Sequence, residues 1–307
     1  MVSARTALVF PGQGSQRPGM LNTVPELDSL DRLLDAAEAL SGLELRGVVE
    51  FGPADQLADT RVAQPLLYLA DWAWGLTLVE SGVEPFAVAG HSLGELAALA
   101  VAGVFSVEAG LELVVERSKL MAAAAHSRPG AMTAVLGLDR AAVAAAIDGL
   151  EDVWLANDNS AGQVVISGSG DAVKAASDKL AEVGARRVVA LNVSGAFHTP
   201  MMESAGLAFA DLLLGAAFDD ARIPVYQNTD PTPETDGDAI RERLIGQITS
   251  PVRWTETMDA LVADAPVTVI ECGPGNVLAG LARRIEGVTA YSVESVSLET
   301  IVEEVQR

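Results

Sequence analysis

A serine flanked by glycines is the residue of this chain best placed to carry out a reaction. The pentapeptide Gly90-His91-Ser92-Leu93-Gly94 follows the apolar run 86–89 and precedes the helix-like run 95–100. A serine on a sharp turn between a strand and a helix is held out of the sheet, above the positive end of the helix. This context predicts that Ser92 is a nucleophile, although the five letters alone also fit an ordinary turn.

A nucleophilic serine needs a general base, because its hydroxyl is hardly ionised at neutral pH. Of the three histidines, His91 adjoins the serine in a tight turn, so we expect its side chain to point elsewhere and to pack or hydrogen-bond. His126 ends a predicted helix, where a cation suits the helix dipole. His198 directly follows a predicted strand, where functional side chains are common, although loop histidines are also often plain surface residues.

The order of these residues argues against one well-known serine enzyme layout. An α/β-hydrolase places its triad in the order serine, acid, histidine, with the histidine late in the chain. Here the long segment 199–307 follows the last histidine. An activity other than hydrolysis therefore has to be considered.

Composition excludes several partners. The 307 residues carry a net charge of -22, which disfavours nucleic acid and anionic membrane surfaces. One cysteine, Cys272, and three histidines without metal-ligand spacing predict no disulfide and no metal. The chain start lacks a signal-peptide layout, and no apolar run is long enough to cross a membrane. We therefore expect a cytoplasmic protein.

Hydrophobic patterning predicts an α/β fold with an insertion. A strand at 6–10 and a turn at 11–14 are followed by helices at 27–40 and 65–79. The next segment then reads β-α-β-β-α-β, at 131–138, 140–150, 153–156, 163–167, 171–184 and 187–193, which is the order of a ferredoxin-like unit. The α/β pattern returns at Val267–Ile270, and Asp230–Asp238 is predicted to be a surface loop. We predict a large α/β-hydrolase-like domain with a parallel sheet (1–129 and 196–307) and an inserted ferredoxin-like α+β subdomain (130–195).

Several segments together resemble the malonyl-CoA:acyl carrier protein transacylase family. They are Phe10-Pro11-Gly12-Gln13-Gly14-Ser15-Gln16, Gly90-His91-Ser92-Leu93-Gly94-Glu95, Arg117, Gly195-Ala196-Phe197-His198, Ser250-Pro251-Val252-Arg253-Trp254 and Glu271-Cys272-Gly273-Pro274-Gly275. Their order and spacing span essentially the whole chain, so a chance match is very improbable. The inserted subdomain also matches that family's small subdomain.

The resemblance implies catalytic roles. Ser92 is acylated and His198 is its base, oriented by a backbone carbonyl at Ser250 instead of by an acid. The backbone N–H groups of Gln13 and Leu93 are the implied oxyanion donors. The chemistry separately favours Leu93, whose amide lies at the start of the predicted helix.

The resemblance also implies how an acyl group is chosen. Most helix arginines are solvated, but Arg117 corresponds to the family's ligand for the malonate carboxylate. Phe197 and Leu93 resemble the residues that leave little room for an α-methyl branch, although both also suit a core. Supporting substrate contacts are expected from Gln64, Asn159 and His91.

These residues imply transfer of malonyl from malonyl-CoA to the phosphopantetheine thiol of an acyl carrier protein, for fatty acid synthesis. Coenzyme A thioester is then a substrate, no cofactor is bound, and the enzyme is expected to be a monomer. Arg283 and Arg284 are the predicted carrier-protein patch, with Arg186 and Arg187 as second choice.

Three alternatives stay open. A discrete acyltransferase of a polyketide pathway would use the same motifs. A serine thioesterase or esterase is favoured only if Arg117 is exposed and malonyl-CoA is hydrolysed without a thiol acceptor. A non-catalytic carrier-binding protein is disfavoured, because Ser92, His198 and Arg117 are all present.

Overall fold

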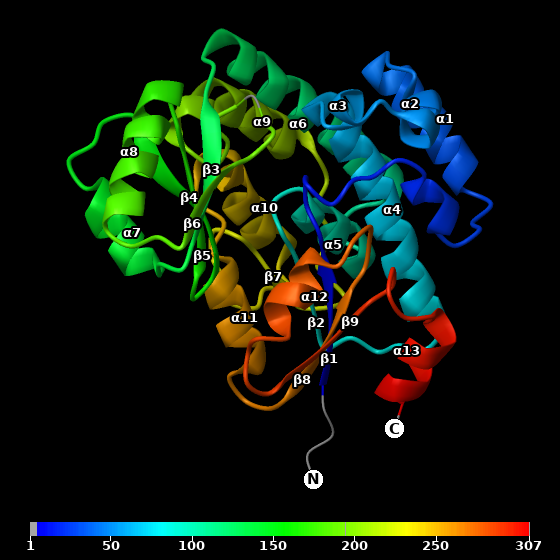
Figure 1. Ribbon diagram of the computed structural model, residues 1–307. Coiled ribbons are helices and arrows are strands. Elements are labelled where there is room, and N and C mark those ends of the chain that lie inside the picture. The colour runs from blue at the N-terminus through cyan, green and yellow to red at the C-terminus, as the bar shows by residue number, and fades with distance from the viewer. Residues whose placement is uncertain (1–4, 194, 307) are drawn as a thin grey trace.

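Two β-sheets and the helices around them form the computed structural model, which describes residues 5–193 and 195–306 (Figure 1). Ser194 and the outermost residues of the predicted large domain therefore lie outside the described part. The larger sheet is parallel and has the order β7-β2-β1-β8-β9. Its strands are β1 (Arg5–Phe10), β2 (Ala87–Gly90), β7 (Val225–Tyr226), β8 (Val267–Glu271) and β9 (Val288–Ser292).

The second sheet is antiparallel and lies at the left of Figure 1. Its strands β3 (Ala131–Leu136), β4 (Val153–Ser160), β5 (Gln163–Gly168) and β6 (Arg187–Ala190) have the order β4-β5-β3-β6. Two helices, α7 (Arg140–Ile147) and α8 (Gly170–Glu182), complete the unit. The predicted α/β fold and the β-α-β-β-α-β chain order are confirmed, with the last strand ending at residue 190, before the predicted 193.

Helices cover both faces of the parallel sheet. Along β1, Leu8 and Phe10 face one core while Ala7 and Val9 face another, as the alternation of a strand requires. The first core is shared with α1 (Leu30–Ser41), α2 (Leu45–Phe51), α3 (Ala54–Leu57), α4 (Thr60–Glu80), α5 (Gly94–Ala102), α6 (Val107–Ser127), α9 (Glu203–Gly215), α10 (Gly237–Ile245) and α13 (Leu298–Val305). The second is shared with α11 (Trp254–Val262) and α12 (Val277–Ala282).

Capping residues explain where helix boundaries differ from prediction. The Asp59 side chain accepts the Arg61 N–H, so α4 begins at Thr60 and takes Pro65 into its interior, whereas the sequence pattern placed that proline at the front. A turn in which the Leu30 N–H bonds the Leu27 carbonyl delays α1 to residue 30. Asp236 caps α10, so the predicted 230–238 loop ends two residues early.

The small sheet is joined to the rest of the chain close to the carboxyl ends of the parallel strands. Backbone bonds run from Asp158 N–H to the Val252 carbonyl (2.9 Å) and from Val252 N–H to the Ala156 carbonyl (2.8 Å). In residues 5–193 and 195–306, no helix is both long and apolar enough to cross a bilayer. Nor does this part of the chain gather three or more metal-ligating side chains.

Candidate active site

Ser92 occupies a sharp turn between β2 and α5. Its φ is +54°, in the left-handed region, and Leu93 caps the helix that follows. A β-carbon at Gly90 would lie 2.0 Å from the Gly94 carbonyl, and one at Gly94 would lie 2.1 Å from the Phe10 carbonyl oxygen. Both glycines are therefore required, because β1, β2 and α5 meet too closely for any side chain. This explains the G-x-S-x-G spacing and exposes the hydroxyl at the strand ends.

The histidine that follows β6 meets this serine. Ser92 Oγ lies 2.7 Å from His198 Nε2, and His198 Nδ1 lies 3.1 Å from the carbonyl oxygens of both Ser250 and Gln247. Carbonyls only accept, so they favour the tautomer with hydrogen on Nδ1, which leaves Nε2 free to accept the serine proton. Burial, aided by the nearby Arg117 cation, lowers the pKa of His198 to about 3. The imidazole is thus neutral and poised as a base.

Arg117, on α6, is buried beside the same hydroxyl. Only 1% of the residue is exposed. Its Nη1 donates to Gln64 Oε1 (2.7 Å), and its Nη2 donates to Gln247 Oε1 (2.8 Å) and to Ser92 Oγ (3.2 Å). Burial lowers its pKa to about 10, so it stays charged at neutral pH. These acceptors are neutral groups, and the cation can still pair with a carboxylate on an acyl group bound at the serine.

The glycine turn after β1 abuts the serine turn. A β-carbon at Gly12 would lie 2.5 Å from the His91 carbonyl oxygen. The Gln13 side chain is held by α3 and α4, donating to the Ala58 carbonyl (3.2 Å) and accepting from Thr60 Oγ1 (3.1 Å). Neither the backbone N–H of Gln13 nor that of Leu93 has an acceptor among the described residues, and an oxyanion hole needs such unoccupied donors.

His91 links the serine turn to the small sheet. Its Nε2 lies 2.9 Å from Asn159 Oδ1 on β4, and its ring centre lies 5.5 Å from that of Trp254. Burial lowers the pKa of His91, so the neutral ring donates this hydrogen bond. The side chain points away from the Ser92 hydroxyl, as the sequence predicts. Both His91 and Asn159 thus lie next to the site without contacting Ser92 Oγ.

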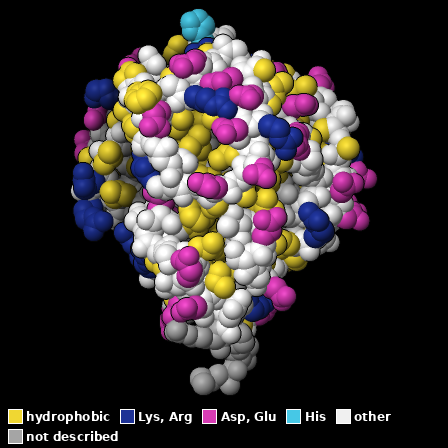
Figure 2. Space-filling view, turned by 90° about the vertical axis from the view of Figure 1, so that its right-hand side faces the viewer, with side chains coloured by type: hydrophobic (Ala, Val, Ile, Leu, Met, Phe, Trp, Pro, Cys, Tyr) yellow, Lys and Arg dark blue, Asp and Glu magenta, His cyan; other side chains and the backbone are white. Residues whose placement is uncertain are grey.

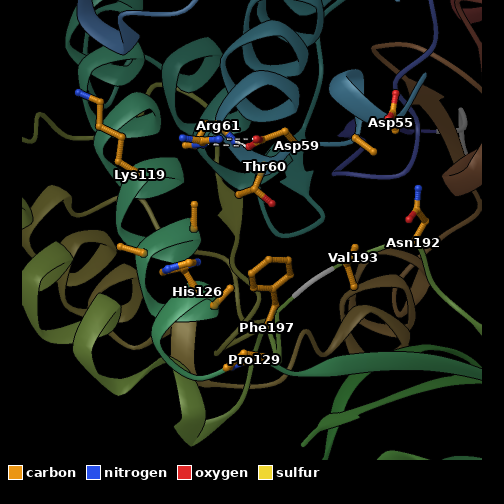
Figure 3. Close-up of a pocket in the computed structure, with 14 residues that line it drawn as sticks. Asp55, Asp59, Thr60, Arg61, Lys119, His126, Pro129, Asn192, Val193 and Phe197 are labelled. Carbon is orange, nitrogen blue, oxygen red and sulfur yellow. Dashed lines mark hydrogen bonds and ion pairs between the residues drawn. The ribbon is translucent and has the colours of Figure 1, made fainter. Parts of the chain in front are cut away.

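A cleft of about 870 Å³ opens beside the catalytic pair (Figure 3). Its lining comes from α3, the start of α4, α6 and the segment before His198. Figure 3 shows the Phe197 ring and Thr60 facing this space. Phe197 directly precedes His198, and Thr60 holds the Gln13 side chain, so the cleft borders the neighbours of the site, while Ser92 and His198 are not among its lining residues.

The structure also assembles residues that the sequence prediction missed. Gln247 lies three residues before the predicted carbonyl of Ser250 and supplies a second carbonyl to His198, and its side chain contacts Arg117. Asn228 follows the two-residue strand β7 and accepts the Ser92 N–H (2.7 Å) while donating to the Gly90 carbonyl (2.6 Å). Polar residues directly after a parallel strand were the available signal, but β7 is too short to be recognised.

The predicted carrier patch is separate from this cluster. Arg283 and Arg284 are exposed just beyond α12 and do not line the cleft. Arg186 and Arg187 are also exposed, at the start of β6. The chain that leaves β6 does line the cleft, through Asn192 and Val193.

Comparison with known proteins gives consistent matches. The acyl transferase domain family matches residues 7–307. A malonyl CoA-acyl carrier protein transacylase of Synechocystis is 43% identical over 91% of this chain and 93% of its own length. A polyketide biosynthesis malonyl CoA-acyl carrier protein transacylase of Bacillus subtilis is 39% identical over 91% and 96%. A solved malonyl-transacylase structure, in complex with its type II polyketide acyl-carrier protein, superposes with a TM-score of 0.91 at 37% identity, covering 98% of this chain and 100% of that chain.

Proposed function

This chain belongs to the malonyl-CoA:acyl carrier protein transacylase family of acyl transferase domains, and we propose that it moves malonyl from malonyl-CoA to the phosphopantetheine thiol of an acyl carrier protein. The product supplies extender units for fatty acid synthesis. The observation that carries this proposal is a buried arginine, Arg117, donating to the hydroxyl of a serine that also bonds a neutral histidine.

In the first half of the reaction, Ser92 Oγ attacks the thioester carbonyl while its proton passes to His198 Nε2. The Gln13 and Leu93 N–H groups hold the oxyanion, and Arg117 binds the free carboxylate of malonate. The carbon–sulfur bond then breaks, and coenzyme A leaves with the proton from His198. Malonyl remains on Ser92 as an ester.

The second half runs the same steps with a different thiol. The phosphopantetheine S–H gives its proton to His198, and the sulfur attacks the malonyl ester. The tetrahedral intermediate collapses, malonyl leaves on sulfur, and Ser92 recovers its proton. Because coenzyme A leaves a covalent malonyl-serine before the carrier thiol enters, the kinetics are ping-pong.

Burial of Arg117 weighs against the esterase alternative. An acetyl group would leave the guanidinium without its carboxylate partner, at a cost of roughly 1–3 kcal/mol. A thioesterase for simple acyl chains has no use for a buried cation beside its nucleophile. The polyketide alternative has direct support from the named relatives, since one serves polyketide biosynthesis.

Intact-mass spectrometry after brief exposure to malonyl-CoA tests the proposal. We expect a malonyl adduct that maps to Ser92 and disappears when a carrier-protein thiol is added. Hydrolysis of the adduct at the same rate without the thiol would favour the esterase. No adduct on active enzyme would rule out the mechanism.

We further propose the finer features of the enzyme. The domain over 1–129 and 196–307 is hydrolase-like, and the 130–195 insertion is ferredoxin-like, a reading supported by the strand order β4-β5-β3-β6. The enzyme works as a cytoplasmic monomer, without a bound cofactor or metal, and its partners are malonyl-CoA and the carrier, not nucleic acid or membrane. Size-exclusion chromatography with light scattering tests the oligomeric state.

The carrier is proposed to bind at Arg283 and Arg284. Carrier proteins of this kind are acidic, so a chain of net charge -22 must offer a local cationic surface. The centre of the face in Figure 2 is a poor candidate, because its few Lys and Arg side chains lie among carboxylates, whereas several gather only at the left-hand edge of that view. Ion pairs with neighbouring acids occupy many of the other arginines, among them Arg17, Arg46 and Arg61.

A further inference from the structure

Glu95 is a buried carboxylate one turn from the nucleophile that the proposed reaction does not use. It is fully buried at the start of α5. Its Oε1 accepts from Gln227 Nε2 (3.1 Å), and its Oε2 accepts from the Asn228 N–H (3.0 Å) and from Gln247 Nε2 (3.2 Å). Every partner is a donor. Burial raises the pKa of Glu95, whereas these hydrogen bonds and the Arg117 charge oppose the rise. A protonated carboxyl would direct its own hydrogen at one of the donors, so the contacts favour the ionised form.

The orientation of the Gln247 amide is fixed by chemistry. Its Oε1 accepts from Arg117 Nη2 (2.8 Å), and a guanidinium can only donate. The Nε2 must therefore face the other way, toward Glu95 Oε2 and the Ser92 carbonyl oxygen (2.8 Å). The amide places its oxygen against the cation and its NH₂ against the anion.

Gln247 thus separates a buried ion pair. Attraction to the Glu95 charge raises the pKa of Arg117 and so opposes the lowering that burial causes. Yet no oxygen of Glu95 bonds the guanidinium, because all three of its hydrogen bonds come from Gln227, Asn228 and Gln247. A carboxylate in direct contact would occupy the N–H groups that an acyl carboxylate needs. With an amide between them, the cation is stabilised without being neutralised by contact.

We propose that Glu95 and Gln247 are a positioning pair that keeps Arg117 charged, aimed at Ser92 and available to the carboxylate of the acyl group. This inference rests on the proposed function. Neither residue touches the acyl group. Glu95 acts through Gln247 and Arg117, whereas Gln247 also bonds the Ser92 carbonyl and His198. The preference between acyl groups is therefore the readout, because an effect on attack that is common to two thioesters cancels in their ratio.

An exchange of charge tests the pair. Glu95→Gln alone loses the anion, and Gln247→Glu alone sets two carboxylates side by side. The double variant Glu95→Gln with Gln247→Glu restores one anion and one amide, so the charge balance recovers, although a carboxylate at 247 cannot donate to the Ser92 carbonyl as the native amide does. The carboxylate now contacts Arg117 directly, which is the arrangement that the native order avoids.

The measurement is the ratio of kcat/KM for malonyl-CoA to that for acetyl-CoA in acyl-enzyme formation, together with the urea midpoint. In the double variant we expect a midpoint above that of Gln247→Glu alone, and a ratio lower than the native one on the order of 10- to 100-fold, mainly through the malonyl KM. Gln227→Met is the matched control. It removes a buried hydrogen bond to Glu95 without touching Gln247, so it should lower the midpoint and leave the ratio unchanged.

The outcomes separate this inference from the proposed function. A double variant that recovers both the midpoint and the malonyl preference would show that Glu95 is merely structural and overturn the pair. An equal loss of preference in Gln227→Met would do the same. Native enzyme that forms no malonyl-serine would instead refute the proposed function.

Discussion

Arg117 Nη2 donates a hydrogen bond of 3.2 Å to Ser92 Oγ, so the nucleophile and a buried cation share one small space. The same hydroxyl lies 2.7 Å from His198 Nε2. The base and the cation reach the serine from different elements, the loop after β6 and the helix α6. In the proposed reaction, attack and selection of the acyl group would therefore both take place around this one oxygen atom.

Replacing Arg117 should reduce the preference for malonyl-CoA over acetyl-CoA without abolishing acylation of Ser92. In Arg117→Ala we expect kcat/KM for malonyl-CoA to fall on the order of 100-fold, because a charge-assisted contact is lost, while acetyl-CoA loses much less. Arg117→Lys should recover little, since one ammonium cannot make the bidentate contact. Arg128→Ala is the control, because that arginine is half exposed and pairs with Asp152. Equal losses for both thioesters would contradict the role of Arg117.

The pH dependence of acyl-enzyme formation should reveal the depressed pKa of His198. Its folded value of about 3 lies below the ordinary 6.5, so the neutral, active base persists as the pH falls through 6.5. We expect the rate of serine acylation by a neutral acetyl thioester to show no inflection near pH 6.5. Rapid-quench measurements from pH 8 to pH 5 check this, and an inflection at 6.5 would contradict it.

The Arg117 cation contributes to that lowering, after burial. Arg117→Met removes the charge and keeps an apolar side chain of similar length. The pKa of His198 should therefore rise, and the acid limb of the acetyl profile should move to higher pH. An unchanged limb would mean that burial alone sets the pKa.

Sequence patterns singled out Ser92, His198 and Arg117, which the structure brings into contact, but they did not single out the residues that hold these three in place. Ser92, His198 and Arg117 stand in motifs whose spacing reflects tight geometry, such as the glycines that β1 and α5 force into close contact. Gln247 and Asn228 have no such pattern. Their importance comes from hydrogen bonds across more than 130 residues of sequence, which arise only after the parallel sheet has formed.

Gly94 offers a test of why the serine turn tolerates no side chain. In Gly94→Ala the new methyl would lie 2.1 Å from the Phe10 carbonyl oxygen, so β1 and α5 must separate. We expect the free energy of unfolding to fall by about 1–3 kcal/mol and serine acylation to slow. Gly170→Ala, at the start of α8, is the matched control, because nothing lies within 4 Å of its β-carbon position. Urea titration of both variants decides, and equal stabilities would argue against the close packing.

Phe197 should restrict branched acyl groups. Its ring is buried at the end of the cleft and packs so closely on Gly195 that a β-carbon there would lie 2.5 Å from Cε1. The ring therefore has little room to move aside for an α-methyl group. In Phe197→Ala we expect the ratio of methylmalonyl to malonyl transfer to rise about 10-fold, since one methyl is worth roughly 1–3 kcal/mol. Competition between the two thioesters measures the ratio. An unchanged ratio would mean that the α-methyl branch does not meet the Phe197 ring.

Charge reversal should locate the carrier surface. Arg283→Glu with Arg284→Glu is expected to slow malonyl transfer from Ser92 to the carrier, most strongly at low salt, because screening weakens long-range attraction. Acyl-enzyme formation from malonyl-CoA should stay unchanged, since neither residue lines the cleft. Arg186→Glu with Arg187→Glu makes the same change of charge at the second-choice patch and serves as the comparison. If only this second pair slows transfer, the carrier approaches over the β6 edge, whose continuation through Asn192 and Val193 lines the cleft. If neither pair does, shape and the phosphopantetheine arm, not these arginines, guide the carrier to the serine.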